Sequence, residues 1–292
     1  AMPTRPCRTI WTAADDPRAE DRHDTRLTPR ATLSVRSMLP DGPRNDMFGR
    51  MYRYVLRRTH WPPRDSSGYR PQPRARRTVR YVLTPPSFDG TGKHYMGREI
   101  SDVMGWQASA WLEREERESE ERTDLLLQAL DIRPGMVIAD IGAGTGYLSR
   151  LLSPMVKPEG RILAVDVQPM MVRMLQRLTR LDGFDNIEPL RCLEHDVQLP
   201  PATADMAIML DVYHELACPH EMLGSIVRAV KPGGQVVFVE FKEEDPDIPI
   251  KPLHKMSEAR VRREAAVHRL VWERTLDHLP WQHIIVFRKT AR

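Results

Sequence analysis

The glycine-rich stretch VIADIGAGTGYL at residues 137–148 constrains this 292-residue chain more than any other part of its sequence. Four of its first five residues are apolar, as in a strand buried on both faces, and only Asp140 interrupts them. Three glycines then alternate with other residues, and helical spacing resumes at Tyr147. The stretch predicts a strand, a tight turn and a helix in succession, with backbone that a ligand can approach closely.

The spacing of the glycines separates two classes of nucleotide-binding fold. A dinucleotide site requires G-x-G-x-x-G, and Tyr147 stands where the third glycine would be. Asp140, just before the turn, suits a ligand with a positive centre better than a pyrophosphate. The pattern D-I-G-A-G-T-G at residues 140–146 resembles motif I of the class I S-adenosylmethionine-dependent methyltransferases, type 11/25-like. The resemblance implies S-adenosyl-L-methionine as cofactor; the alternative is a glycine turn in an unrelated α/β domain.

Strand and helix patterns alternate regularly after this motif, as they do in α/β folds. The second strand, Arg161–Asp166, ends in an acid that can accept hydrogen bonds from both ribose hydroxyls. A K-P-G-G turn, Lys231–Gly234, precedes the fifth strand, where it is frequent in the family. For a core at residues 131–292 the resemblance implies a doubly wound α/β fold. Its seven-stranded, mostly parallel sheet would have the order 3-2-1-4-5-7-6, with the last strand antiparallel.

The first part of the chain differs in composition from the rest. Its first 90 residues contain 18 arginines, no lysine and 12 of the 25 prolines. Because so many arginines and prolines do not favour a packed core, we expect residues 1–89 to be a poorly ordered basic extension. The exceptions are a possible amphipathic helix at Met47–Thr59 and a possible short strand at Thr78–Leu83. A second charge-rich run, Glu113–Arg122, is expected to be a solvated helix face.

Composition also limits the partners and the compartment. No apolar run approaches the about 20 residues of a membrane span. The three cysteines are widely spaced and form neither a disulfide framework nor a C-x-x-C metal site. We therefore expect a cytoplasmic protein with no membrane association. A small-molecule substrate is the leading alternative among the functions that the family resemblance implies. Nucleic acid is a possible partner of the basic extension but not the favoured one, and the sequence leaves the oligomeric state open.

Residues 90–130 are expected to form a helical lid, because this segment commonly folds over the cofactor in the family. Gly90–Gly97 is predicted to be a mobile loop that carries Tyr95 and Met96 at its tip, and Trp106 follows in an apolar stretch. These three side chains are the predicted lid and substrate contacts, since methyl transfer requires water to be excluded. The alternative is a plain helical cap whose tryptophans are buried for stability alone.

The resemblance implies that the cofactor lies at the carboxyl ends of the strands, where open parallel sheets bind ligands. The implied cofactor contacts are Asp140, Gly142, Ala143, Gly144, Gly146, Asp166, Val167, Asp196 and Asp211. Asp196 is the predicted adenine contact, although the family's usual acid would fall on His195 and Glu194 is also adjacent.

Three residues after the fourth strand are predicted to lie nearest the reacting atoms: Asp211, Tyr213 and His214. Methyl transfer is an in-line displacement that needs positioning, and it needs a general base only when the nucleophile arrives protonated. His214 has a suitable pKa range for a base, although a histidine after a strand is often structural. Tyr213 could orient the acceptor or the donor, or could pack in the core.

Other chemistries remain as alternatives. Catechol-type methyltransferases hold magnesium through acids after strands four and five. Asp211 matches the first position, but Glu240, Glu243, Glu244 and Asp245 do not reproduce the second, so no metal ligand is assigned. The acceptor's nucleophile, an oxygen, nitrogen or sulfur atom, stays open. An RNA or protein methyltransferase that uses the basic arm, and a non-catalytic binder of the cofactor, are the alternatives from other classes.

Overall fold

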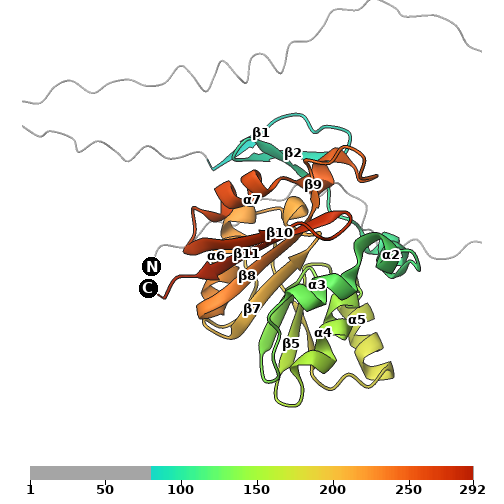
Figure 1. The fold of residues 1–292 in the computed structure, drawn as a ribbon. Coiled ribbons are helices and arrows are strands. Elements are labelled where there is room, and N and C mark those ends of the chain that lie inside the picture. Colours follow the sequence, from blue (N-terminus) through green and yellow to red (C-terminus); the bar gives the residue numbers. More distant parts are fainter. Residues whose placement is uncertain (1–79, 292) are drawn as a thin grey trace, which may run out of the picture. The chain divides into compact units, whose positions relative to one another are not determined.

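The structure, a computed structural model, describes residues 80–291 (Figure 1). The predictions of a poorly ordered extension, of a helix at Met47–Thr59 and of a nucleic-acid arm lie outside these residues. Within residues 80–291, no helix has both the length and the apolar character needed to cross a bilayer. Cys192 is a free buried thiol.

One large sheet dominates the described part of the chain. Its strands are β4 (Val137–Ile141), β5 (Arg161–Asp166), β6 (Ile187–Arg191), β7 (Ala204–Leu210), β8 (Val230–Lys242), β10 (Leu270–Leu276) and β11 (Gln282–Lys289). They lie in the order β10-β11-β8-β7-β4-β5-β6, and β11 is antiparallel to both of its neighbours. This is the predicted order with the predicted antiparallel last strand. A two-residue strand, β9 (Lys255–Met256), additionally pairs with β8.

Alternation along the strands divides the core into two layers. Ala139 and Ile141 of β4 pack on one face of the sheet, and Ile138 packs on the other. The first face is covered by α6 (Pro219–Ala229) and α7 (Glu258–Ala265). The helices of the other face are α3 (Thr123–Ala129), α4 (Tyr147–Val156) and α5 (Pro169–Leu181). Figure 1 shows α3, α4 and α5 together at the β5 side of the sheet.

A second, three-stranded sheet precedes the large one and corrects two predictions. Its strands are β1 (Tyr81–Leu83), β2 (Gly90–Tyr95) and β3 (Arg98–Ser101). The expected mobile loop at Gly90–Gly97 is instead β2 and its hairpin turn. Met96 and Gly97 both have positive φ, as the two-residue turn of a tight hairpin requires. The predicted short strand at Thr78–Leu83 is confirmed by β1, so the boundary placed at residue 89 cuts through this sheet.

The remainder of the expected lid is only partly helical. After β3 come a 3₁₀ helix, η1 (Trp106–Glu113), and the short helix α2 (Arg117–Glu121). Two further 3₁₀ turns lie beside the large sheet, η2 (Tyr213–Glu215) after β7 and η3 (Pro252–His254) before β9. These irregular segments meet at the carboxyl ends of the parallel strands and build the site described next.

Candidate active site

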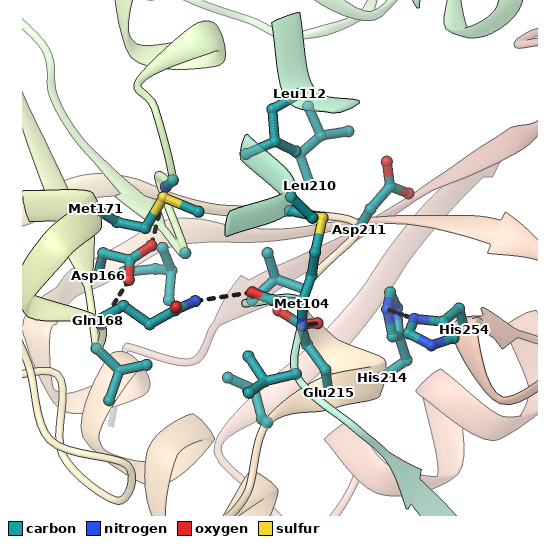
Figure 2. A pocket seen from close by; sticks show the side chains of 18 of the residues that line it. Met104, Leu112, Asp166, Gln168, Met171, Leu210, Asp211, His214, Glu215 and His254 are labelled. Atoms are coloured by element: carbon teal, nitrogen blue, oxygen red, sulfur yellow. Dashed lines mark hydrogen bonds between the residues drawn. The ribbon is translucent and has the colours of Figure 1, made fainter. Parts of the chain in front are cut away.

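A cavity of about 570 Å³ opens at the carboxyl ends of β4, β5 and β7. The glycine turn, the first residues of α5 and the η2 turn line it, and residues before α2 close it from the opposite side. Figure 2 shows Asp166 and Gln168 at one end of the cavity and His214 with His254 at the other. The cavity thus lies where an open parallel sheet is expected to bind its ligand.

The glycine turn is held in a backbone conformation that side chains disfavour. Gly142, Gly144 and Gly146 all have positive φ, between 54° and 86°. A Cβ atom on Gly146 would lie 2.2 Å from Leu175 Cδ1, and one on Gly142 would lie 2.6 Å from Val212 Cγ2. Glycine is therefore required at these positions by packing as well as by φ. Gly142 and Gly144 line the cavity; the neighbouring Ala143 and Gly146, also predicted contacts, do not.

Asp140 does not face the cavity, in contrast to its predicted contact with the cofactor. Its carboxylate accepts a hydrogen bond of 2.6 Å from Ser149 Oγ on α4. Burial raises the pKa of Asp140 to about 6, and the nearby Asp166 raises it further while the Ser149 bond opposes the rise. Asp140 therefore ties the strand to the helix on the two sides of the glycine turn.

Asp166 stands at the end of β5 with its carboxylate lining the cavity, as predicted. One oxygen accepts a bond of 2.9 Å from the Gly144 N–H, and the other accepts one of 2.7 Å from the Gln168 N–H. Burial raises the pKa of Asp166, and these backbone hydrogen bonds oppose the rise. Each oxygen retains acceptor capacity, so the carboxylate fits the two hydroxyls of a ribose. Val167 lines the cavity beside it.

Gln168 joins the two sides of the cavity. Its side-chain amide donates to the Met104 carbonyl at 2.9 Å and accepts from the Trp106 N–H at 2.9 Å (Figure 2). The Met104 N–H in turn donates to Glu215 Oε2 at 3.0 Å. A continuous run of hydrogen bonds thus leads from Asp166 through Gln168 and Met104 to Glu215.

The predicted lid residues lie away from the cavity. Tyr95 is buried between Tyr81 and His220, with ring centroids 5.6 Å and 6.3 Å away, and belongs to the small sheet. Met96 sits at the hairpin turn and Trp106 is 40% exposed, and neither lines the cavity. The side chains that do close it come from the following residues: Val103, Met104, Ala108, Trp111 and Leu112. A cover before the core is present, but it is built from other residues than those predicted.

The charge run before the core contributes a buried ion pair to the cavity wall. Arg117 Nε lies 2.9 Å from Glu121 Oε2, and both side chains are about 5% exposed. The guanidinium also donates to the Leu112 carbonyl at 2.8 Å and stacks over the Tyr147 ring, 4.1 Å from its centroid. The run is therefore not simply a solvated face. Its spacing of four residues between Arg117 and Glu121 is the signal that could have identified the pair.

Asp211 lines the cavity after β7, as predicted, with a positive φ of 55°. Its Oδ2 accepts a bond of 3.2 Å from Gln282 Nε2, whereas Oδ1 is buried without a hydrogen-bond partner among residues 80–291. Burial raises the pKa of Asp211 well above its usual value, and the negative charges of Glu121 and Glu240 act in the same direction. The side chain therefore offers a buried polar atom for a ligand to satisfy.

Tyr213, a predicted catalytic residue, is part of the core. Its side chain is fully buried, and its ring packs edge-on against Phe238 with centroids 4.9 Å apart. It does not line the cavity, because η2 turns its side chain under the sheet while the next residue faces the ligand side. The structure thus favours the packing alternative for this residue.

His214 lines the cavity and is held by a buried glutamate. Its Nδ1 lies 2.6 Å from Glu240 Oε2, and the other oxygen of Glu240 accepts a bond of 2.7 Å from the Tyr213 N–H. Burial lowers the pKa of His214, but the attraction of Glu240 outweighs this and the pKa is raised overall. Glu240 was considered only as a magnesium ligand in the sequence, and its role beside His214 was not predicted.

Two further residues at this end of the cavity, His254 and Glu215, were not predicted from the sequence. His254 Nδ1 lies 3.3 Å from His214 Nε2 (Figure 2). His254 Nε2 lies 2.9 Å from Asp89 Oδ2. Burial and the neighbouring His214 lower the pKa of His254. Glu215 lines the same end of the cavity, and burial raises its pKa to about 7 although His214 opposes the rise.

Arg98 fixes the backbone that carries this group. Its guanidinium forms a buried pair with Glu264, with Nε 2.9 Å from Oε1, and donates to the His214 carbonyl at 3.0 Å. Burial opposes the charge of Arg98, but Glu264 raises its pKa overall. A residue of the small sheet thus positions the η2 turn.

The predicted adenine contact is placed elsewhere by the structure. The Asp196 carboxylate bonds to Arg228 at 3.0 Å and to the Gln198 N–H at 2.8 Å, and it does not line the cavity. Glu194 is the acid of this loop that does line it. The acids after β8 are also used locally, since Glu243 accepts from the Ser257 N–H at the start of α7.

Comparison with known proteins extends these observations. A family model described as a methyltransferase domain matches residues 139–236. The ubiquinone/menaquinone biosynthesis C-methyltransferase UbiE of Hydrogenovibrio crunogenus is 30% identical over 113 residues, which are 38% of this chain and 44% of that protein. The UbiE of an Enterobacter strain is 27% identical over 129 residues, 44% of this chain and 50% of that protein. The chain spans about half the length of these curated relatives.

A solved structure shares the fold. A SAM dependent methyltransferase from Aquifex aeolicus superimposes with a TM-score of 0.61 at 24% identity, covering 64% of this chain and 100% of that one. The finer assignment to a type 11/25-like family stays a prediction. The motif at residues 140–146, the strand order and the methyltransferase-domain match over residues 139–236 agree, and the chain is similar to the class I S-adenosylmethionine-dependent methyltransferases.

Proposed function

We propose that this protein is an S-adenosylmethionine-dependent methyltransferase that acts on a small-molecule acceptor. The observation that carries the proposal is a single cavity that joins the glycine turn and Asp166 to the polar group around His214. Its volume of about 570 Å³ lies within the about 300–1,000 Å³ typical of small-ligand sites. Relatives named as C-methyltransferases of ubiquinone/menaquinone biosynthesis also support a small acceptor.

The residues at the glycine end fit the cofactor. Asp166 has acceptor capacity for both ribose hydroxyls, and Gly142 and Gly144 leave the backbone open to a close approach. Asp211 Oδ1 is a buried acceptor that a cationic group of the ligand would satisfy. Glu194, rather than Asp196, would contact the adenine. The bound cofactor supplies a methyl group on a sulfonium that is already activated for displacement.

The remaining task of the protein is to position the acceptor and to exclude water. Trp111, Leu112 and Ala108 give the cavity an apolar wall opposite the strand ends. Of the three predicted catalytic residues, His214 stays in the proposal as the one that acts on the acceptor. Its Nδ1 is committed to Glu240, so its Nε2, which lies 3.3 Å from His254 Nδ1, is the atom that would act.

Calorimetry and a methylation assay test this proposal together. We expect the protein to bind S-adenosylhomocysteine and not NAD, and to label at least one member of a panel of small hydroxyl, thiol, amine and quinol compounds. Bulk RNA and a protein mixture are the comparison acceptors. Preferential labelling of RNA or protein would replace the small-molecule acceptor. Binding without any labelling would identify a non-catalytic binder, and tight NAD binding without S-adenosylhomocysteine binding would refute the cofactor as well.

A further inference from the structure

Two histidines face each other across a narrow gap at the acceptor end of the cavity. His214 Nε2 and His254 Nδ1 lie 3.3 Å apart, and both residues line the cavity. The outer nitrogen of each ring lies against a carboxylate, His214 Nδ1 at 2.6 Å from Glu240 and His254 Nε2 at 2.9 Å from Asp89. Figure 2 shows the two rings turned toward one another.

Glu240 decides which nitrogen of His214 carries hydrogen. His214 Nδ1 is hydrogen-bonded to this carboxylate, so the lone pair of Nε2 faces His254. His254 Nε2 lies 2.9 Å from Asp89 Oδ2, but neither atom has a hydrogen-bond partner among residues 80–291. The contact of 3.3 Å between the inner nitrogens is therefore either an N–H of His254 that donates to His214, or two lone pairs that share a cation.

A third ligand stands beside this gap. Glu215 follows His214 in η2, and its carboxylate and the two imidazole nitrogens all lie within 4.8 Å of one another. We propose that His214, His254 and Glu215 bind one Zn²⁺ ion, with Glu240 and Asp89 as the carboxylates that orient the two histidines. Two imidazoles and one glutamate are the protein ligands of a known class of open zinc site.

The spacing of the ligands agrees with this ion. In a tetrahedral zinc site with Zn–N bonds of about 2.0–2.1 Å, two nitrogens lie about 3.3–3.4 Å apart. The two histidines already have this separation, at 3.3 Å. Magnesium and calcium prefer oxygen ligands throughout, so a site with two imidazoles disfavours them. Histidines that bind metals almost always donate their other N–H to a carboxylate or a carbonyl. His214 has Glu240 as this partner, and His254 Nε2 has the Asp89 carboxylate 2.9 Å away.

The fourth position of the ion would face the cavity, where the acceptor binds if the proposed function holds. A hydroxyl or thiol bound there would release its proton to solvent more readily, because a divalent cation lowers its pKa. The acceptor's electron pair would then form the bond to the methyl carbon. The carbon–sulfur bond of the donor breaks, and its electron pair stays on sulfur. Hydroxyl and thiol compounds are thus the acceptor class that this site would take.

Metal binding can be measured without any methylation. The 292-residue chain without an affinity tag is treated with a chelator and titrated with Zn²⁺, Co²⁺ and, without oxygen, Fe²⁺. We expect one Zn²⁺ per chain and, with Co²⁺, the intense visible absorption of a tetrahedral ion. S-adenosylhomocysteine binding by the same metal-free protein reports on the proposed function separately, so the two proposals can fail independently.

Variants locate the site. His254→Ala and His214→Ala should lose the bound ion, and Glu240→Gln should weaken its binding by about 10–100-fold. His268→Ala is the matched control, because His268 belongs to another pair of neighbouring histidines, with its ring centroid 4.8 Å from that of His220. It should retain the ion. Since the cobalt spectrum is read on the unchanged protein, a variant that fails to fold does not remove the test.

Three results would overturn the inference. If no ion binds to the unchanged chain, the gap holds a shared proton and His214 is a proton acceptor. If His254→Ala binds as tightly as His268→Ala, the ion lies elsewhere. If Fe²⁺ binds and Zn²⁺ does not, the donor set is that of an iron site and the assignment of zinc is wrong.

Discussion

Arg98 and Glu264 form a two-bonded ion pair that is buried on both sides, although 166 residues separate them in the chain. The pair connects the small sheet to α7, and the same guanidinium reaches the carbonyl of His214. Because Arg98 donates to Glu264 and to the His214 carbonyl, it joins the small sheet both to α7 and to the η2 turn beside the cavity.

Arg98→Met should therefore be strongly destabilising. It leaves the Glu264 carboxylate buried without its partner, which typically costs about 3–5 kcal/mol of unfolding free energy. Arg161→Ala, which breaks the half-exposed pair with Glu188, should cost at most about 1 kcal/mol. Denaturant unfolding measures both. Adding Glu264→Leu to Arg98→Met should recover part of the lost unfolding free energy. If Arg98→Met and Arg161→Ala have equally small effects, the buried pair does not stabilise the fold as proposed.

Shortening the chain tests the boundary of the fold. A fragment that begins at Thr78 keeps β1, with Arg80 and Tyr81 bonded to Glu221 at 2.6 Å and 2.5 Å. A fragment that begins at Pro86 loses all of these contacts. Its melting temperature should be lower by several degrees, since about 1 kcal/mol corresponds to about 2–4 °C in a domain of this size. Equal melting temperatures would show that β1 contributes nothing.

Asp166→Ala should weaken the binding of S-adenosylhomocysteine. The loss of charge-assisted hydrogen bonds to the ribose is worth about 1.5–3 kcal/mol, or about a 10–150-fold change in dissociation constant. Asp196→Ala is the control, because its carboxylate is bonded to Arg228 outside the cavity. Calorimetry should show that Asp196→Ala binds S-adenosylhomocysteine with unchanged affinity. Loss of binding in the control would restore Asp196 as the adenine contact.

Gly146→Ala should cost more stability than Gly183→Ala. Both glycines have positive φ, so each substitution carries a strain of roughly 1–2 kcal/mol. Only the Cβ at position 146 also meets a buried side chain, Leu175 Cδ1 at 2.2 Å, whereas the one at 183 meets no described atom within 4 Å. Overpacking adds about 1–3 kcal/mol. Chemical denaturation that shows equal losses would contradict the packing argument.

Asp140 should make stability depend on pH in an unusual direction. Because its pKa is raised to about 6 in the folded protein, the folded state binds more protons than the unfolded state between about pH 4 and 6. Its contribution is therefore most favourable below this window and is lost as the pH rises through it, by up to about 3 kcal/mol.

The variant Asp140→Asn keeps an acceptor for Ser149 and does not ionise. The difference in unfolding free energy, variant minus unchanged protein, should increase from pH 4 to pH 7 and then level off. Ser153→Ala, which removes a hydroxyl bonded to Asn186, is a control on the same helix and should show no such trend. A difference that stays constant with pH would mean that Asp140 is not strongly desolvated.

The sequence predicted the large sheet well because its signals are local. The glycine pattern at residues 140–146 and the short apolar strands that follow are each read from neighbouring residues. The same holds for Asp166, whose place at the end of β5 brings it to the cavity. Strand order followed from the family resemblance, which these local signals supported.

The small sheet and the histidine pair were not predictable in the same way. β2 reads GTGKHY, which has no alternation of apolar and polar residues, and its hairpin turn uses Met96 at a positive φ where Gly or Asn is usual. His214 and His254 are 40 residues apart, and they meet only because η3 returns to the carboxyl end of β7. Tyr213 is next to His214 in the sequence, but its side chain packs in the core instead of lining the cavity. Neighbouring positions in the sequence did not reveal this difference.

The hydrogen bonds from Asp166 through Gln168 and Met104 to Glu215 have a thermodynamic consequence. The first residue of this run lies at the glycine end of the cavity and the last lies beside His214, so a shift of Gln168 or Met104 would change hydrogen bonds toward both ends. Occupation of one end should therefore alter the free energy of occupation at the other. Since such linkage is reciprocal, the factor by which the cofactor changes acceptor affinity must equal the factor by which the acceptor changes cofactor affinity. We therefore expect the two halves of the cavity to bind their ligands cooperatively.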